Sequence, residues 1–118
     1  MPIKRIQSGT RMSQAVIHNG IVYLSGQVAA GTPGASVTIQ TKEILASIDA
    51  LLVAAGTDRG RLLTAMIWLT DMATFAEMNK VWEAWVVAGS APTRATVSSP
   101  HLASAEFKIE IAVTAAQP

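Results

Sequence analysis

The stretch AVIHNGIVYL, residues 15–24, decides how the fold begins. Two short runs of β-favouring residues, 15–18 and 21–24, flank the dipeptide Asn19-Gly20. A type I′ turn requires a positive φ angle at both of its central residues, and Asn-Gly is among the pairs that tolerate this best. The stretch therefore predicts a β-hairpin near the start of the domain, and the residues ahead of it leave room for one more short strand.

Residues 37–55, which follow a Gly- and Pro-containing segment at 30–35, have the period of a helix. Their apolar positions recur at helical spacing, at Ile44, Ile48, Leu51, Leu52 and Ala55. Gly56 comes next, at the position where many helices end on a left-handed residue. The pattern predicts a helix over 37–55 that ends at Gly56.

A second helix is expected to begin near Thr74. Thr74 and Glu77 match the S/T-x-x-E capping box, in which each side chain accepts a hydrogen bond from a free backbone N–H at the other end of the turn. One apolar stripe follows, formed by Phe75, Met78, Trp82, Trp85 and Val86. We interpret the two tryptophans of this stripe as core residues, and Gly89 and Pro92 as the end of the helix.

Three further segments favour β-strands. Residues 61–70 carry apolar side chains at both parities, which indicates a strand covered on both faces. Residues 93–98 and 107–115 are expected to form the last two strands, and large apolar side chains occupy every second position of the latter. The order of elements predicts a two-layer α+β domain over residues 1–118, with both helices on one face of a mixed sheet.

The composition indicates that something other than water covers part of the surface. Only 14% of the 118 residues are charged and 50% are hydrophobic, whereas about 25% of the residues of a typical soluble domain are charged. No apolar run approaches the roughly 18 to 20 residues of a membrane span, and the N-terminus lacks a signal-peptide apolar region. We therefore expect a cytoplasmic homo-oligomer without membrane contact, whose subunits pack through the sheet face opposite the helices.

Several classes of function have no support in the sequence. The chain has no cysteine, which excludes disulfides and thiolate metal sites, and its P-loop, dinucleotide-binding and zincin motifs are absent. A net charge of +1 gives no broad electrostatic footprint for nucleic acid. The two histidines lie far apart, which argues against a metal site: His18 is expected to be a solvated turn residue, and His101 to lie in a solvent-facing or interface loop.

Two charged residues inside the predicted strands are the candidates for chemistry. Arg94 lies early in the strand 93–98, and Glu110 lies in the middle of the strand 107–115. An unpaired buried charge is costly, so one interpretation is a cross-strand salt bridge, either between these two residues or with Lys108. The other is functional: Arg94 presents a planar fork of N–H donors to a small carboxylate, while Glu110 handles a proton or holds a water molecule. Spacing alone leaves both interpretations open.

Three segments of the chain together resemble the signatures of the Rid family, the reactive intermediate (enamine/imine) deaminases once called YjgF proteins. The segments are NGIVYLSGQV at 19–28, APTRATV at 91–97 and KIEIAV at 108–113. The segment AMIWLTDM at 65–72, followed by FAEMN at 75–79, is similar to the middle segment of the family. The resemblance covers nearly the whole chain in order and spacing.

The resemblance implies a chorismate-mutase-like α+β fold assembled as a homotrimer, with sites in the clefts between adjacent subunits. It implies hydrolysis of 2-imino acids and their enamine tautomers to 2-keto acids and ammonia, as in a 2-iminobutanoate/2-iminopropanoate deaminase, without a cofactor. Arg94 matches the arginine that binds the substrate carboxylate, and Glu110 matches the glutamate that positions or activates the attacking water. Pocket-lining positions of the family match Ser25 and Asn79, and main-chain groups around Gly26 and Thr96 would complete the cleft.

One departure from the family pattern concerns the rim of this cleft. Many members carry an aromatic residue in a G-P-Y-S-Q-like stretch near the N-terminus, whereas residues 10–14 are TRMSQ, so Met12 takes the aromatic position. Thr96 stands where members usually carry a cysteine.

The resemblance leaves two alternatives to imine hydrolysis. The first is a binding module, in which the same cleft captures a small carboxylate or keto acid and reports it without turnover. The second is the endoribonuclease activity that has been attributed to this family. The net charge of +1 and the absence of an Arg/Lys stripe argue against RNA as the main partner, because phosphate contacts dominate such affinity.

Overall fold

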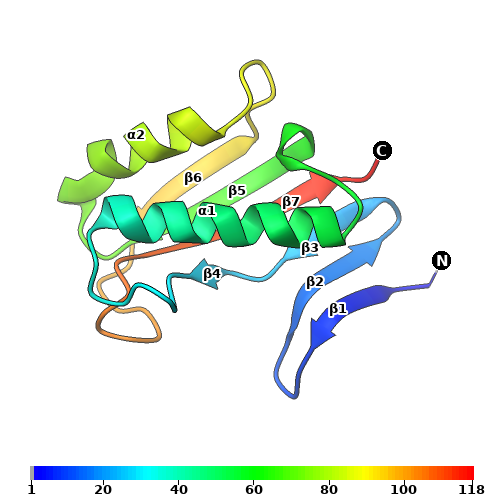
Figure 1. Cartoon of the computed structure of the whole chain (residues 1–118), viewed down its shortest axis with the longest axis horizontal. Coiled ribbons are helices and arrows are strands. Elements are labelled where there is room, and N and C mark those ends of the chain that lie inside the picture. Colours follow the sequence, from blue (N-terminus) through cyan, green and yellow to red (C-terminus); the bar gives the residue numbers. More distant parts are fainter. Residues whose placement is uncertain (1) are drawn as a thin grey trace.

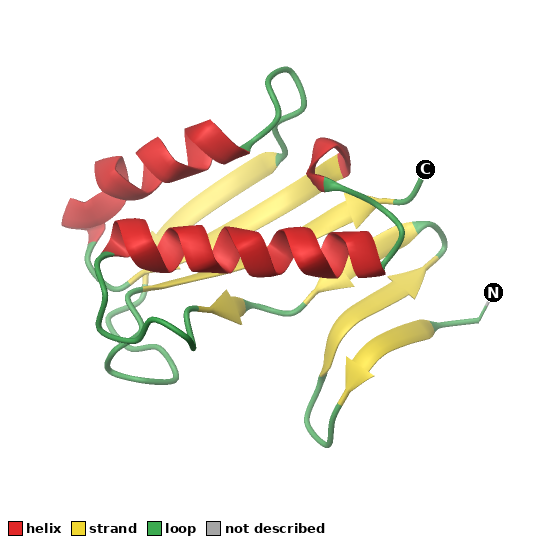
Figure 2. Ribbon diagram, in the orientation of Figure 1, coloured by secondary structure: helices red, strands yellow, loops and turns green. Residues whose placement is uncertain are grey.

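The computed structural model describes residues 2–118, which form a seven-stranded mixed sheet with two α-helices on one of its faces (Figure 1). The helices are α1 (Val37–Ala54) and α2 (Phe75–Trp85). The strands are β1 (Lys4–Ser8), β2 (Ser13–His18), β3 (Ile21–Leu24), β4 (Gln27–Val28), β5 (Leu62–Leu69), β6 (Thr93–Ser98) and β7 (Ile109–Ala116). Their order in the sheet is β1-β2-β3-β7-β5-β6, with β4 also paired to β7, and only β5 and β6 run parallel. The predicted α+β architecture is confirmed (Figure 2).

The hairpin predicted from residues 15–24 is present as β2 and β3. His18 and Ile21 are register partners on either side of the turn, and Asn19 and Gly20 have φ angles of 52° and 77°. Both central residues therefore adopt the positive φ that a type I′ turn requires. β1 adds a further antiparallel strand at this edge of the sheet, in the room that the sequence left for it.

α1 begins and ends close to the positions that the sequence predicts. The Ser36 hydroxyl accepts a hydrogen bond from the backbone N–H of Ile39, at 3.2 Å, and Gly56 beyond the last turn has a φ of +80°. The apolar positions at helical spacing are buried against the sheet, with Ile44, Ile48 and Leu52 wholly enclosed. This helix covers the middle of the sheet and contacts β3, β4 and β7.

The capping box predicted at Thr74 and Glu77 is wrong. The Thr74 hydroxyl donates to the Asp71 carbonyl at 2.6 Å, because a short 3-10 turn (Met72–Thr74) precedes α2 and gives Thr74 a near-helical backbone. Asp71 caps that turn, since its carboxylate accepts from the Ala73 N–H at 2.9 Å. Glu77 instead accepts from the backbone N–H and the hydroxyl of Thr38, at 2.9 and 2.8 Å. This carboxylate therefore joins α2 to the first turn of α1.

Replacing Glu77 with glutamine is expected to lower the unfolding midpoint by a few degrees at pH 7. The hydrogen bonds from Thr38, first from its hydroxyl and then from its N–H, hold the pKa of Glu77 below its usual 4.5. A lowered folded-state pKa stabilises the fold above pH 4.5, and that contribution is lost as the pH falls through the lowered value. Thermal unfolding should show a larger difference between wild type and variant at pH 7 than at pH 3. An equal loss in Glu83→Gln, an exposed carboxylate on the same helix, would contradict the assignment.

α2 differs from its predicted stripe at both ends. Met78, Trp82 and Trp85 are buried, and the rings of the two tryptophans lie 5.4 Å apart, as core residues do. Phe75, however, keeps 38% of its surface exposed. The helix ends at Trp85, four residues before Gly89, because Val86 adopts an extended backbone; Gly89 serves the turn that follows.

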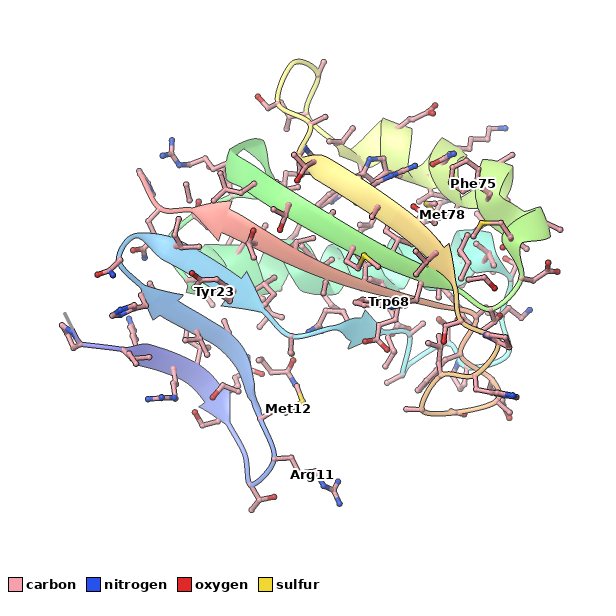
Figure 3. The ribbon with its side chains drawn as sticks, turned by 180° about the vertical axis from the view of Figure 1, so that it is seen from behind. Arg11, Met12, Tyr23, Trp68, Phe75 and Met78 are labelled. Carbon is pink, nitrogen blue, oxygen red and sulfur yellow. The ribbon has the colours of Figure 1, made fainter. Side chains whose placement is uncertain are left out.

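The sheet has one covered face and one open face. Strand positions that face the helices are buried, among them Ala65, Ile67, Leu69, Ile109, Ile111 and Val113. The opposite face carries the exposed Tyr23 and the half-buried Trp68 (Figure 3), and it contains a shallow hollow of about 480 Å³ lined partly by Met66, Ala95 and Ala112. The sequence predicts a strand that is covered on both faces at this position. Within this chain only one face of β5 is covered, by the helices. Within residues 2–118, neither helix has the length and hydropathy that crossing a membrane requires.

Candidate active site

Glu110 is the second residue of β7, nearer the start of the strand than the sequence predicts, and it lies on the open face of the sheet. Its register partners are Trp68 on β5 and Val28 on β4, so a strand flanks it on either side. The side chain is half-buried, and this burial raises the pKa of the Glu110 carboxyl above its usual 4.5. Among residues 2–118, no side chain or main-chain donor bonds to the carboxylate, and no cation pairs with it. A carboxylate in this state is suited to accept a proton.

Gly26 leaves the space that the Glu110 carboxyl group occupies. A Cβ atom built on Gly26 would lie 2.9 Å from Cδ of Glu110 and closer still to its Oε2. The chain breaks its strand pairing here, between the end of β3 and the start of β4, which brings the Gly26 backbone against β7. Glycine at this position therefore sets where the carboxyl group lies.

Gly26→Ala should slow any reaction in which Glu110 accepts a proton by about 10²-fold, because a misplaced reacting group commonly costs that much in rate. The variant should still fold. The backbone of Gly26 has no positive φ, so alanine brings no conformational strain, and the atoms it meets are the mobile end of Glu110. Steady-state kinetics and thermal unfolding of the same preparation measure the two effects. Gly9→Ala is the matched control, since its nearest contact would be an ordinary 3.7 Å. Full activity in Gly26→Ala would show that the carboxyl position does not matter.

Ser25 is held beside Gly26 by a network of glutamines. Its hydroxyl donates to Oε1 of Gln14 at 3.1 Å, and Nε2 of Gln27 donates to the same Gln14 oxygen at 3.0 Å and to the Ser25 carbonyl at 3.1 Å. These bonds join β2 to the connection between β3 and β4. The network fixes the segment that carries Ser25 and Gly26, and neither glutamine was predicted from the sequence as part of a site.

Arg94 lies on β6 and faces the helix layer, opposite to Glu110. Its register partner is the buried Ala65, whereas that of Glu110 is Trp68, three positions further along β5 and on the other face. At about 4.8 Å between strands and 3.3 Å per residue, the two Cα atoms are roughly 14 Å apart. The salt bridge considered between them is therefore wrong, and neither residue pairs with Lys108. The only ion pair within residues 2–118 joins Arg59 to Asp49, at 3.7 Å.

Aromatic rings, rather than a carboxylate, contact the Arg94 guanidinium. Its central carbon is 5.7 Å from the ring centre of Phe75 and 5.6 Å from that of Trp82, both on α2. The half-buried Asn79 lies between these rings on the same helix face, four residues after Phe75 and three before Trp82. The i, i+4, i+7 spacing was visible in the sequence, but nothing there indicated that β6 would pack beneath it.

Thr96 follows Arg94 on the same face of β6. Its side-chain hydroxyl is buried and has no hydrogen-bond partner among the described residues. The side chain thus provides an unused donor and acceptor two positions from the guanidinium.

The two histidines differ: His101 lies in an exposed loop as expected, but His18 is half-buried with an enclosed Nδ1, so the solvated position predicted for it is wrong.

Met12 lies far from Arg94. It is 47% exposed at the turn between β1 and β2, at the edge of the sheet opposite to β6 (Figure 3). The predicted site residues thus form two groups and one outlier. Arg94, Thr96 and Asn79 lie between β6 and α2; Ser25, Gly26 and Glu110 lie around the β3–β4 connection. Within residues 2–118, no group of three or more His, Asp and Glu side chains is arranged to hold a metal ion.

Comparison with known proteins places this arrangement in a family. Residues 2–117 match the family model described as Endoribonuclease L-PSP. The chain is 42% identical to a RutC family protein of Haemophilus influenzae, over 98% of both chains, and 43% identical to the RutC family protein YoaB of Escherichia coli, over 98% of this chain and 99% of the relative. A crystal structure of a YjgF family member from Neisseria meningitidis matches with a TM-score of 0.95 and 42% identity, over 100% of this chain and 97% of the other. The chain belongs to the Rid (YjgF) family.

Proposed function

We propose that this protein hydrolyses reactive 2-imino acids and their enamine tautomers to 2-keto acids and ammonia, in clefts between adjacent copies of the chain. The proposal rests on one observation: a single chain holds a cation, Arg94, and an anion, Glu110, too far apart to act on the same substrate. Among residues 2–118, the guanidinium of Arg94 and the carboxylate of Glu110 have no charged partner, and they lie on opposite faces of the sheet. A second copy that brings its own Glu110 to Arg94 would complete a site holding both.

Two surfaces of the chain support such an assembly. Arg94 lies on β6, an edge strand that other chains can approach. The open face of the sheet exposes apolar side chains, including Tyr23 at 47% and Val97 at 39%, beside the hollow. Exposed apolar faces of this kind mark interfaces between subunits. We propose the homotrimer with a chorismate-mutase-like arrangement that the family resemblance implies. A head-to-tail contact that closes into such a ring repeats the same composite site at each interface.

The chemistry needs an anchor, a base and a water molecule. Arg94 binds the substrate carboxylate through two parallel N–H donors, which places the imine carbon in the cleft. The water oxygen bonds to that carbon while Glu110 takes one proton from the water. Glu110 then passes this proton to the imine nitrogen, which gives a carbinolamine. The hydroxyl proton then moves to the nitrogen, the C–N bond breaks, and ammonia leaves behind a 2-keto acid. The raised pKa of Glu110 makes the carboxylate a better proton acceptor in these steps.

A coupled assay tests the proposal. An amino acid oxidase generates 2-imino acids from several amino acids, and semicarbazide traps whatever imine remains. The protein should lower the yield of semicarbazone in proportion to its concentration for at least one substrate. Titration calorimetry with 2-keto acids runs in parallel. Tight binding without any gain in hydrolysis would identify a binding module. The absence of both binding and hydrolysis would overturn the proposal.

A further inference from the structure

The guanidinium of Arg94 lies between two aromatic rings. Phe75 and Trp82 are seven residues apart on α2, which corresponds to a rise of about 10.5 Å along the helix axis. The guanidinium carbon lies 5.7 Å from one ring centre and 5.6 Å from the other. These distances place the cation between the rings, and both are within the roughly 6 Å over which a ring attracts a cation.

Rings and carboxylates hold an arginine in different ways. A carboxylate accepts hydrogen bonds in the plane of the guanidinium and so occupies its donors, whereas a ring attracts the cation through its face and leaves the N–H groups in the plane free. Among residues 2–118, no acceptor takes a hydrogen bond from Arg94, and none of its nitrogens is enclosed without a partner. The donors of Arg94 are therefore open to a ligand.

A free arginine side chain loses conformational entropy when it binds a ligand, because its long, flexible stem is then held in one rotamer. Contacts with two rings restrict the side chain before any ligand arrives. A restricted guanidinium with free donors binds a planar carboxylate with less entropy loss than a mobile one. The rings also leave the charge of the guanidinium available to the ligand, because they carry no opposite charge to neutralise it.

We propose that Phe75 and Trp82 are positioning residues for Arg94, and that they hold its guanidinium ready to receive the substrate carboxylate. This inference rests on the proposed function, because it assigns Arg94 as the anchor. Trp82 is 5% exposed and is part of the core, whereas Phe75 is 38% exposed. Phe75 can therefore be changed with little effect on folding.

The test measures kinetics and 2-keto acid binding in Phe75→Leu, which keeps an apolar side chain but removes the ring. KM and the Kd of the 2-keto acid should rise about 3- to 10-fold, the size of one cation–π contact, with kcat unchanged because Glu110 is untouched. Phe75→Tyr keeps a ring and should restore both constants. Val87→Ala, an equally exposed apolar residue after α2, should change neither. Phe75→Met repeats the test if the leucine variant folds poorly.

A second measurement separates a contact with Arg94 from a general effect on the fold. The unfolding midpoints of Phe75→Leu, Arg94→Ala and the double variant form a double-mutant cycle. The double variant should lose less stability than the two single losses combined, since both remove the same contact. Additive losses together with an unchanged KM in Phe75→Leu would overturn the inference while the wild type still hydrolyses imines. A wild type that neither hydrolyses imines nor binds 2-keto acids would instead overturn the proposed function, and the cycle would still report on the contact.

Discussion

Arg94→Ala is expected to lower kcat/KM for a 2-imino acid by roughly 10²- to 10³-fold, as expected when one partner of a close charge pair is removed. Within residues 2–118 no carboxylate pairs with the guanidinium, so its loss breaks no ion pair inside the chain. The assembly should therefore remain intact. Coupled oxidase kinetics measure the loss, and sedimentation of the same sample measures the oligomeric state.

Arg94→Lys provides the matched control for charge. Lysine keeps the positive charge but lacks the planar fork that binds a carboxylate through two parallel bonds. It should recover part of the binding lost in the alanine variant and fall short of the wild type. Wild-type activity in Arg94→Ala, with an unchanged Kd for 2-keto acids, would remove the anchor from the proposal.

Glu110→Gln is expected to lower kcat about 10²- to 10⁴-fold, the usual contribution of a general base. The same change should raise the unfolding midpoint at neutral pH. Burial raises the folded-state pKa of this carboxyl above 4.5, so ionisation favours the unfolded chain once the pH exceeds the unfolded value. The stability gain of the glutamine variant should therefore be absent at acid pH and should grow as the pH rises through the folded-state pKa.

The pH dependence of wild-type activity follows from the same shift. A base must be ionised to act, so kcat should increase with pH across an acid limb that lies above pH 4.5. Glu83→Gln, on the exposed side of α2, should leave activity and its pH profile unchanged. A glutamine variant of Glu110 with normal kcat, or one destabilised at neutral pH, would contradict the assignment of a buried base.

The features that the sequence predicted well are those encoded by neighbouring residues. The Asn19-Gly20 turn has the positive φ angles of its type, and α1 ends beside a left-handed Gly56, because both depend on local backbone sterics. The sequence did not predict β4, because a strand of two residues is too short to show the alternation of apolar and polar side chains that marks a strand. The capping box failed because Glu77 has a better donor in Thr38, which is 39 positions away in the sequence.

The candidate site was predicted as a set of residues, not as an arrangement. Arg94 and Glu110 were identified from their residue types and from the family resemblance, but their placement on opposite faces depends on the register of β5 between β6 and β7. Neither pair is a hairpin, so no tight turn fixes this register, and it depends on the packing of segments that lie far apart in the sequence. The contact of Arg94 with Phe75 and Trp82 has the same origin, since it requires α2 to pack over β6.

Mixing two inactive variants tests the central claim, that each site draws Arg94 from one copy and Glu110 from another. Arg94→Ala and Glu110→Gln chains carry different affinity tags, are co-expressed, and are purified through both tags in turn to prove that mixed assemblies exist. In a ring assembled at random, about one quarter of the interfaces combine an intact Arg94 with an intact Glu110. The unfractionated mixture should therefore recover about one quarter of wild-type activity, although each variant alone is inactive. Mixed assemblies that stay as inactive as their parents would contradict the shared site.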